Sequence, residues 1–263
     1  MMQSVRLRSL AGVRVLVTRS KPENETLAGK LRELGAVTAE LPTIEFAPPK
    51  NVEPLDRSIG MISKYDWLIF TSAHGVQFFG ERMAAVGERV QKLQGVKVAA
   101  IGSATAAALE RLGKQPDYVP EEFLSEKIVS GLGNIDGKRI LLPRADIAAR
   151  SLPEELRTRG ARVEEVVAYR TIVPKDLTLD RLLLILKRGV DIVTFTSPST
   201  VRNLAHIAGK PGLGTLLKDV TVACIGPVTA EAARSLGVHV NIVASNHTVD
   251  DLVESIVNEK RIV

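Results

Sequence analysis

The stretch Val222–Ala230 reads Val-Ala-Cys-Ile-Gly-Pro-Val-Thr-Ala, and it decides the fold. It joins a buried-strand run, a glycine break and the start of a helix. Pro227 suits the first helical position, where no amide donor is needed, and Gly226 permits a tight turn and the close approach of a ligand. The amides near Thr229 would then face open space at the positive end of a helix dipole, which predicts an anion site.

The same junction occurs a second time, at Ala99–Ala106, which reads Ala-Ala-Ile-Gly-Ser-Ala-Thr-Ala. Gly102 matches Gly226, and Thr105 matches Thr229. A single strand–Gly-x-x-Thr–helix junction is weak evidence of a binding site. Two matched junctions in one chain indicate a repeated unit with a repeated function.

The chain repeats with an offset of 125 residues, which becomes 124 at the two glycine junctions (226 − 102). Gly12–Arg19 matches Gly137–Arg144 (137 − 12), and Phe70–Ser72 matches Phe195–Ser197 with the same offset. Strands alternate with helices in each copy, which is typical of parallel sheets covered on both faces and connected by right-handed crossovers. We therefore predict an α/β fold: two doubly wound parallel-sheet, flavodoxin-like domains that arose by tandem duplication, with five strands per copy.

Hydrophobic runs and glycine stops predict the elements of the first copy. Strands are expected at Val13–Thr18, Val37–Leu41, Asp66–Thr71, Val96–Ile101 and Tyr118–Val119. Helices are expected at Glu25–Leu34, from Ser72 to about Arg82, at Ser103–Leu112 and at Ser125–Leu132.

The repeat leaves two ways to divide the chain into domains. The simpler one splits the chain near residue 136. In the other, segments are exchanged, so that the middle of the chain forms one domain and both ends form the other. Thr43–Pro49 and Ala168–Pro174 favour the exchange, because both are short, extended and proline-terminated at matching places in the repeat. The exchange also places Val15 and Val193 in one sheet.

Composition limits the classes of function. The chain has 263 residues, 45% hydrophobic and 25% charged, with a formal charge of +5. This balance favours anionic ligands, but no long Lys/Arg run or nucleic-acid-binding signature appears, so we expect no nucleic-acid partner. The four histidines are scattered, and we expect no metal. Without a membrane-span run or a signal peptide, we expect a cytoplasmic protein with no membrane contact. The single cysteine, Cys224, is interpreted as a buried apolar residue.

Candidate binding residues lie where predicted strands end and helices begin, the ligand-facing edge of a parallel sheet. They are Thr18, Arg19, Ser72, Ala73, His74, Gly102, Ser103, Thr105, Arg144, Ser197, Pro198, Ser199, Gly226 and Thr229. The plainer interpretation of each is an ordinary helix N-cap. Arg19 and Arg144 are paired by the repeat and are candidates for binding carboxylates bidentately, with surface ion pairs as the alternative.

Tyr169 is the tyrosine of the Ala168–Pro174 segment, and its repeat partner is Ile44. Its phenol either packs in the core or faces a ligand. The chain contains no Ser/His/Asp order, paired catalytic carboxylates, Walker loop or GxGxxG motif. The sequence therefore shows binding machinery without an obvious catalytic centre.

Four motifs together resemble the uroporphyrinogen-III synthase family. They are Phe70-Thr-Ser, Phe195-Thr-Ser-Pro-Ser, Ala168-Tyr-Arg-Thr and Ile225-Gly-Pro-Val-Thr-Ala. Each motif is short and degenerate, but their order and spacing are specific, and the resemblance extends from Val13 to Val257.

The resemblance implies two α/β domains joined by a two-stranded β-ladder. Residues 1–42 and 174–263 would form the first domain and residues 43–173 the second, with hinge strands at 43–49 and 168–174. It also implies an enzyme, a cyclising hydro-lyase, that closes hydroxymethylbilane with inversion of ring D to give uroporphyrinogen III. Neither a cofactor nor a metal is implied.

By motif match, Tyr169 is the candidate for assisting departure of the substrate's hydroxyl, and Thr229 matches a family threonine near the substrate. The family often has a second threonine where this chain has Val228. We expect a monomer that contacts hydroxymethylbilane synthase transiently. The alternatives are a non-enzymatic two-domain protein that binds a polycarboxylate, and a nucleotide-sugar transferase, although no acidic metal or nucleotide motif appears.

Overall fold

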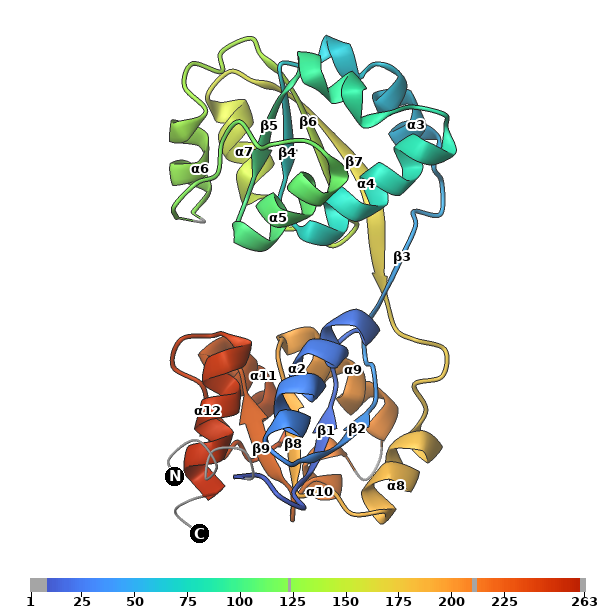
Figure 1. The fold of residues 1–263 in the computed structure, drawn as a ribbon, viewed down its shortest axis with the longest axis vertical. Helices are drawn as coiled ribbons and strands as arrows, with labels where there is room; N and C mark the ends of the chain where they lie inside the picture. Colours follow the sequence, from blue (N-terminus) through green and yellow to red (C-terminus); the bar gives the residue numbers. More distant parts are fainter. Residues whose placement is uncertain (1–8, 123, 210–211, 261–263) are drawn as a thin grey trace. The chain divides into compact units, whose positions relative to one another are not determined.

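The computed structural model describes residues 9–122, 124–209 and 212–260, and these residues form two compact units. Unit 1 comprises the described parts of Met1–Glu45 and Ile172–Val263, and unit 2 comprises those of Phe46–Thr171. Each unit contains a parallel sheet with helices on both faces (Figure 1). The α/β class with parallel sheets, predicted from the alternation of strands and helices, is confirmed.

Unit 1 has the strand order β10-β9-β8-β1-β2, and all neighbouring strands are parallel. The strands are β1 (Arg14–Val17), β2 (Val37–Glu40), β8 (Ile192–Phe195), β9 (Thr221–Cys224) and β10 (Ile242–Val243). The helices are α2 (Lys21–Glu33), α8 (Leu179–Lys187), α9 (Pro198–Ala208), α10 (Leu213–Leu216), α11 (Pro227–Ser235) and α12 (Val249–Lys260). Val15 pairs with Ile192 and Leu16 with Val193, which confirms that Val15 and Val193 share a sheet.

Unit 2 has the strand order β3-β7-β6-β4-β5. The strands are β3 (Glu45–Ala47), β4 (Trp67–Phe70), β5 (Lys97–Ala100), β6 (Arg139–Ala145) and β7 (Arg162–Ile172). The helices are α3 (Glu53–Gly60), α4 (Ala73–Ala85), α5 (Ser103–Leu112), α6 (Ser125–Gly131) and α7 (Ser151–Thr158), with short 3-10 turns η1 (Ile62–Lys64) and η2 (Val90–Gly95). The strand expected at Tyr118–Val119 is reduced to one parallel bridge between Tyr118 and Ala99.

Separate cores cover the two faces of each sheet. In β4, Leu68 and Phe70 face the side covered by α4 and α5, whereas Trp67 and Ile69 face the side covered by α6 and α7. All four side chains are buried, as expected for a central parallel strand. In unit 1, α9 and α11 cover one face, and α2 and α12 cover the other.

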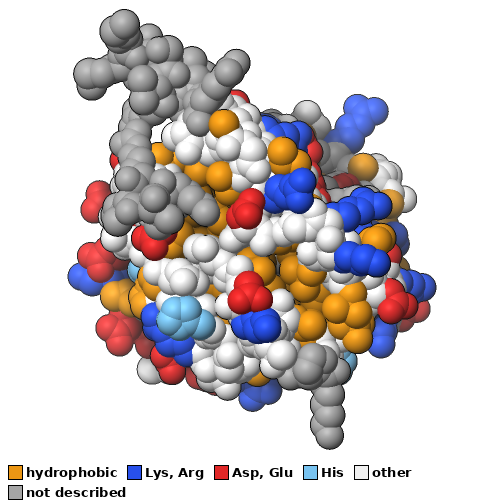
Figure 2. All heavy atoms as spheres, turned by 90° about the horizontal axis from the view of Figure 1, so that it is seen from below, with side chains coloured by type: hydrophobic (Ala, Val, Ile, Leu, Met, Phe, Trp, Pro, Cys, Tyr) orange, Lys and Arg blue, Asp and Glu red, His pale blue; other side chains and the backbone are white. Residues whose placement is uncertain are grey.

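Figure 2 shows charged side chains distributed over one face of the protein. On the face drawn in Figure 2, Lys and Arg stand singly among acidic and hydrophobic side chains, with no continuous basic patch over the described atoms. Within the described ranges, no helix is long and apolar enough to cross a membrane.

Candidate functional site

In both units, the parallel strands end at one edge of the sheet, and helices begin there (Figure 1). The strands β4 and β5 lead into α4 and α5 in unit 2, and β1, β8 and β9 lead into α2, α9 and α11 in unit 1. Most of the predicted binding residues lie at these junctions. Each junction offers main-chain amides at the positive end of a helix.

In unit 2, this edge carries a pair of hydroxyl groups from distant parts of the chain. The Ser72 Oγ lies 2.9 Å from the Tyr169 Oη. Ser72 is the N-cap of α4, and its Oγ also accepts the Gly75 amide at 3.0 Å. Tyr169 is on β7 and is 7% exposed. The N-cap interpretation of Ser72 is thus correct, and the same atom positions the Tyr169 phenol.

An irregularity in the sheet sets the place of Tyr169. Along β6 and β7, Arg144 pairs with Val167 but Ala145 pairs with Tyr169, so one residue of β7 is passed over. Beyond this shift, the Tyr169 carbonyl accepts the Asp146 amide at 3.1 Å. Bulges of this kind redirect side chains and are common beside functional sites.

Aromatic rings surround the Tyr169 phenol. Phe78 stacks on it with the ring centroids 5.7 Å apart, and Phe46 meets it edge-on, also at 5.7 Å. His74 lies 6.0 Å from the Tyr169 ring and 3.8 Å from the Phe46 ring. The hydroxyl pair is therefore the polar end of a cluster that contains three aromatic rings and the His74 imidazole, and Tyr169 itself packs in the buried core of unit 2.

The two Gly-x-x-Thr junctions present hydroxyls that the fold does not use. Thr105 and Thr229 are each 3% exposed, and neither hydroxyl hydrogen-bonds to another residue in the described part of the chain. Gly102 and Gly226 are the N-caps of α5 and α11 and offer no side chain for capping. In contrast, Ser197 caps α9 by accepting the Thr200 amide at 3.3 Å.

The structural reason for glycine differs between the two junctions. Gly102 has φ +94°, a left-handed conformation that favours glycine. Gly226 has φ 177°, which any residue adopts, so the backbone conformation does not itself require glycine there. Glycine is favoured at this position because His247 lies close to it: a Cβ at Gly226 would lie 2.6 Å from the Cδ2 of His247.

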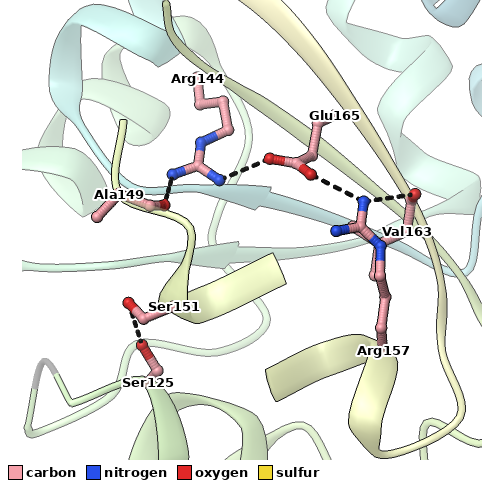
Figure 3. A network of polar contacts seen from close by, with 7 residues as sticks. All are labelled: Ser125, Arg144, Ala149, Ser151, Arg157, Val163 and Glu165. Carbon is pink, nitrogen blue, oxygen red and sulfur yellow. Dashed lines mark hydrogen bonds and ion pairs between the residues drawn. The ribbon is translucent and has the colours of Figure 1, made fainter. Parts of the chain in front are cut away.

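Arg144 is engaged within the protein (Figure 3). It is 8% exposed, its Nη1 lies 2.8 Å from Glu165 Oε2, and its Nη2 donates to the Ala149 carbonyl. Arg157 binds the other Glu165 oxygen at 2.8 Å. Burial raises the pKa of Glu165, but the bonds from Arg157 and Arg144 outweigh it, so this pKa lies below its ordinary value. A carboxylate does bind Arg144, and it is the protein's own.

Other predicted residues have mixed placements. The Thr18 hydroxyl is buried and donates to the Thr194 carbonyl at 2.7 Å, so it serves the sheet. Arg19 is half-buried, and its amide donates to Asn24 Oδ1 at 2.8 Å. Residues in the first turns of their helices are Ala73 and His74 of α4, Ser103 of α5, and Pro198 and Ser199 of α9.

Four residues at these junctions escaped the sequence reasoning. Phe46 and Phe78 pack on Tyr169, Asn24 holds the turn before α2, and His247 covers Gly226. Of these four, the sequence pointed only to the position of Phe46, which lies in the predicted hinge segment. Asn24 makes a local contact, five residues from Arg19, whereas Phe78 and His247 meet their partners through tertiary packing.

The single cysteine can be compared with its interpretation from the sequence. Cys224 is buried, and burial raises its pKa to about 12, so the thiol is an inert core group as interpreted. Among the described residues, no three His, Cys, Asp or Glu side chains are grouped as metal ligands.

Comparisons with known proteins agree on one family. The family model described as uroporphyrinogen-III synthase HemD matches residues 25–254. A uroporphyrinogen-III synthase of Synechococcus elongatus is 33% identical over 252 residues, covering 94% of this chain and 95% of the relative. Solved uroporphyrinogen III synthases from Thermus thermophilus and Helicobacter pylori have TM-scores of 0.66 and 0.64, with 22% and 20% identity. They cover 96% and 94% of this chain, and 100% and 99% of their own, and they show a shared fold.

Proposed function

This chain belongs to the uroporphyrinogen-III synthase family, and from that premise we propose that it is a lyase that closes hydroxymethylbilane with inversion of ring D, giving uroporphyrinogen III for tetrapyrrole biosynthesis. The reaction releases one water. The observation that carries the proposal is the Ser72–Tyr169 hydroxyl pair within its aromatic cluster. A phenol held in this way is suited to protonate a departing hydroxyl.

The proposed steps begin with proton transfer from the Tyr169 Oη to the substrate's hydroxyl, which leaves as water as the C–O bond breaks. The azafulvene formed is attacked by the substituted position of ring D, giving a spiro intermediate. This intermediate opens and closes again with ring D inverted, and the last step releases a proton that restores the phenol. Ser72 fixes the position of the phenol throughout.

The helix N-termini at the sheet edges fit the rest of the substrate. Hydroxymethylbilane carries four acetate and four propionate side chains, and amides at helix N-termini bind carboxylates. The uncommitted hydroxyls of Thr105 and Thr229 add donors at two of these junctions. The formal charge of +5 favours the approach of a polyanion. Holding one substrate conformer accounts for much of the catalysis.

We also propose that the two units are flavodoxin-like domains derived by tandem duplication with exchanged segments. In support, corresponding strands have the same order in the two sheets. Unit 1 has the order β2-β1-β8-β9-β10, and unit 2 has the order β7-β6-β4-β5, with the bridge residue Tyr118 next to β5. The unit boundaries, at Glu45/Phe46 and Thr171/Ile172, fall within the segments proposed as the hinge. That β3 lies beside β7 supports a two-stranded hinge. A monomeric state and transient contact with hydroxymethylbilane synthase remain predictions.

The test is Tyr169→Phe, assayed with hydroxymethylbilane and followed by separation of the type I and type III product isomers after oxidation. The ring and its packing remain, but the proton donor is lost. General acids contribute about 10²- to 10⁴-fold, and we expect the low end or less because the hydroxyl departs readily. Spontaneous closure gives type I, so type I should accumulate while the circular dichroism spectrum is unchanged.

The matched control is Tyr65→Phe. Tyr65 is a buried tyrosine of the same unit, and its hydroxyl binds Glu164 at 2.6 Å. It should lose stability but keep the type III product. A Tyr169→Phe enzyme with the parent rate and only type III product would remove Tyr169 from the mechanism. A parent protein that forms no type III isomer would refute the proposed function itself.

A further inference from the structure

Asn24 carries a buried donor that the described part of the chain does not use. Its side chain is fully buried, and its Oδ1 accepts the Arg19 amide at 2.8 Å. A main-chain N–H only donates, so this bond fixes the orientation of the carboxamide, with the oxygen toward Arg19 and the Nδ2 away from it. No acceptor among the described residues reaches the Nδ2.

The carboxamide lies at the positive end of α2. Ser20 is the N-cap of this helix, and Asn24 reaches back past the cap to Arg19. The Asn24 main-chain amide is satisfied by the Ser20 carbonyl at 2.8 Å, so only the side-chain donors remain uncommitted. Pro22, in the first turn, has no amide hydrogen to contribute. The Nδ2 therefore adds hydrogen-bond donors at a helix end that favours negative charge.

The site lies at the carboxyl-end edge of the unit 1 sheet. Thr18 precedes the turn at the end of β1, and it binds the Thr194 carbonyl of β8, the strand that leads to α9. The parallel pairing of β8 with β9 puts the α11 start, with Thr229, at the same edge. A donor here belongs to the same rim as the substrate-binding residues proposed above.

We propose that Asn24 Nδ2 donates to a carboxylate of an acetate or propionate side chain of the substrate. A buried amide donor without a partner is unfavourable, and a carboxylate satisfies it with a charge-assisted bond. Asn24 is fully buried, so the carboxylate reaches the Nδ2 only when the groups that cover this side chain move aside. This assignment rests on the proposed function and adds a substrate-binding residue to it.

The decisive variant is Asn24→Asp, measured by steady-state kinetics with hydroxymethylbilane and by thermal unfolding. Aspartate keeps an oxygen for the Arg19 amide, removes both donors and places a negative charge at the positive helix end. We expect the melting temperature to stay the same or rise by a few degrees, while KM rises about tenfold or more, as loss of a charge-assisted bond predicts. A purely structural role for Asn24 predicts no change in KM.

Two further variants complete the test. Asn24→Ala removes the donors without adding charge, so KM should rise less than in Asn24→Asp. The melting temperature should fall below that of the parent because the Arg19 amide loses its acceptor. Asn203→Asp makes the same charge change elsewhere in unit 1. Because the Asn203 Nδ2 donates to the Thr43 carbonyl at 2.8 Å, this variant should have a lower melting temperature and an unchanged KM.

The outcomes separate this inference from the function on which it rests. An active parent enzyme with a parental KM in Asn24→Asp overturns the assignment alone. The same holds if Asn24→Ala has the parental KM while Asp raises it, because repulsion would then explain the whole effect. A parent chain that makes no type III isomer overturns the proposed function instead.

Discussion

Thr229 is a proposed substrate-binding residue, and its burial and hydrogen bonding allow that proposal to be tested. It is 3% exposed, yet its hydroxyl binds no other residue in the described ranges. Thr229→Ala removes a buried methyl group but breaks no hydrogen bond within the described residues, so it should lower the free energy of unfolding by about 1 kcal/mol or less. It should raise KM or lower kcat. Kinetics with hydroxymethylbilane and thermal unfolding measure the two effects separately.

Thr200→Ala is the matched control, because the Thr200 hydroxyl donates to the Ser197 carbonyl at 2.7 Å. This variant should lose about 1 kcal/mol more stability than Thr229→Ala, the value of a typical hydrogen bond, and retain its kinetics. If Thr229→Ala lost stability and activity in parallel, Thr229 would have a structural role only.

Gly226 tests the close approach of His247. An alanine Cβ there would lie 2.6 Å from the His247 Cδ2, and His247 is itself at φ +54°. Gly226→Ala should displace the imidazole, which is exposed and can move into solvent, and should lower stability by about 1 kcal/mol or less. Adding His247→Ala should restore most of that loss in a double-mutant cycle measured by chemical unfolding. No recovery would locate the strain in the backbone instead.

At the scale of elements, Glu165 joins three pieces of unit 2. It binds Arg144 of β6 and Arg157 of α7 from its own strand β7 (Figure 3). Its pKa lies below the ordinary value of 4.5, so the unfolded chain takes up the proton first as pH falls. The stability that Glu165 contributes is present above about pH 5 and is lost as pH falls through the folded-state pKa.

Glu165→Gln should reduce the dependence of stability on pH in the range where Glu165 takes up its proton. We expect a lower melting temperature than the parent at pH 7, and a difference that narrows toward about pH 3, measured by calorimetry across the range. Glu155→Gln is the control, because Glu155 forms an ion pair with Arg159 within a single turn of helix. A parent and a Glu165→Gln profile that stay parallel over this whole range would contradict the linkage.

Sequence reasoning succeeded where local pattern decides the element. The buried run of β4 and the glycine-ended α5 follow directly from apolar spacing and the left-handed Gly113. It placed the start of α2 at Glu25, whereas the helix begins at Lys21, because Pro22 is tolerated in a first turn. It missed α3, a short helix that packs through Leu55 and Ile59 and needs the sheet for support.

The candidate site was less predictable, since tertiary geometry assembles it. Ser72 and Tyr169 are 97 residues apart, and the register shift beside Ala145 lets them meet. No local signal announces such a shift. Likewise, the repeat in the sequence aligns Arg144 with Arg19, but it does not indicate that Arg144 forms an ion pair with Glu165. Hydroxyl-bearing residues were found, but their partners were not.

At the scale of the whole molecule, the cores of the two units are separate. The clusters around Phe79 and Ile140 contain only residues of unit 2, and those around Leu204 and Leu252 contain only residues of unit 1. The chain passes between the units twice, at Glu45/Phe46 and Thr171/Ile172. Cooperative unfolding depends on shared buried contacts, so each unit should unfold as its own transition.

A pair of identical substitutions tests this independence. Leu109 in α5 and Leu204 in α9 are both fully buried, one in each unit. Leu→Ala at such sites costs about 2–5 kcal/mol, enough to lower the melting of a unit of this size by roughly 10 °C. In scanning calorimetry, Leu109→Ala should move only the unit 2 transition, and Leu204→Ala only that of unit 1. The double variant should show both shifts at full size, because the sites share no partners. If either single substitution moved the entire unfolding profile as one peak, the units would be energetically coupled, and the two chain crossings would carry far more stability than separate cores allow.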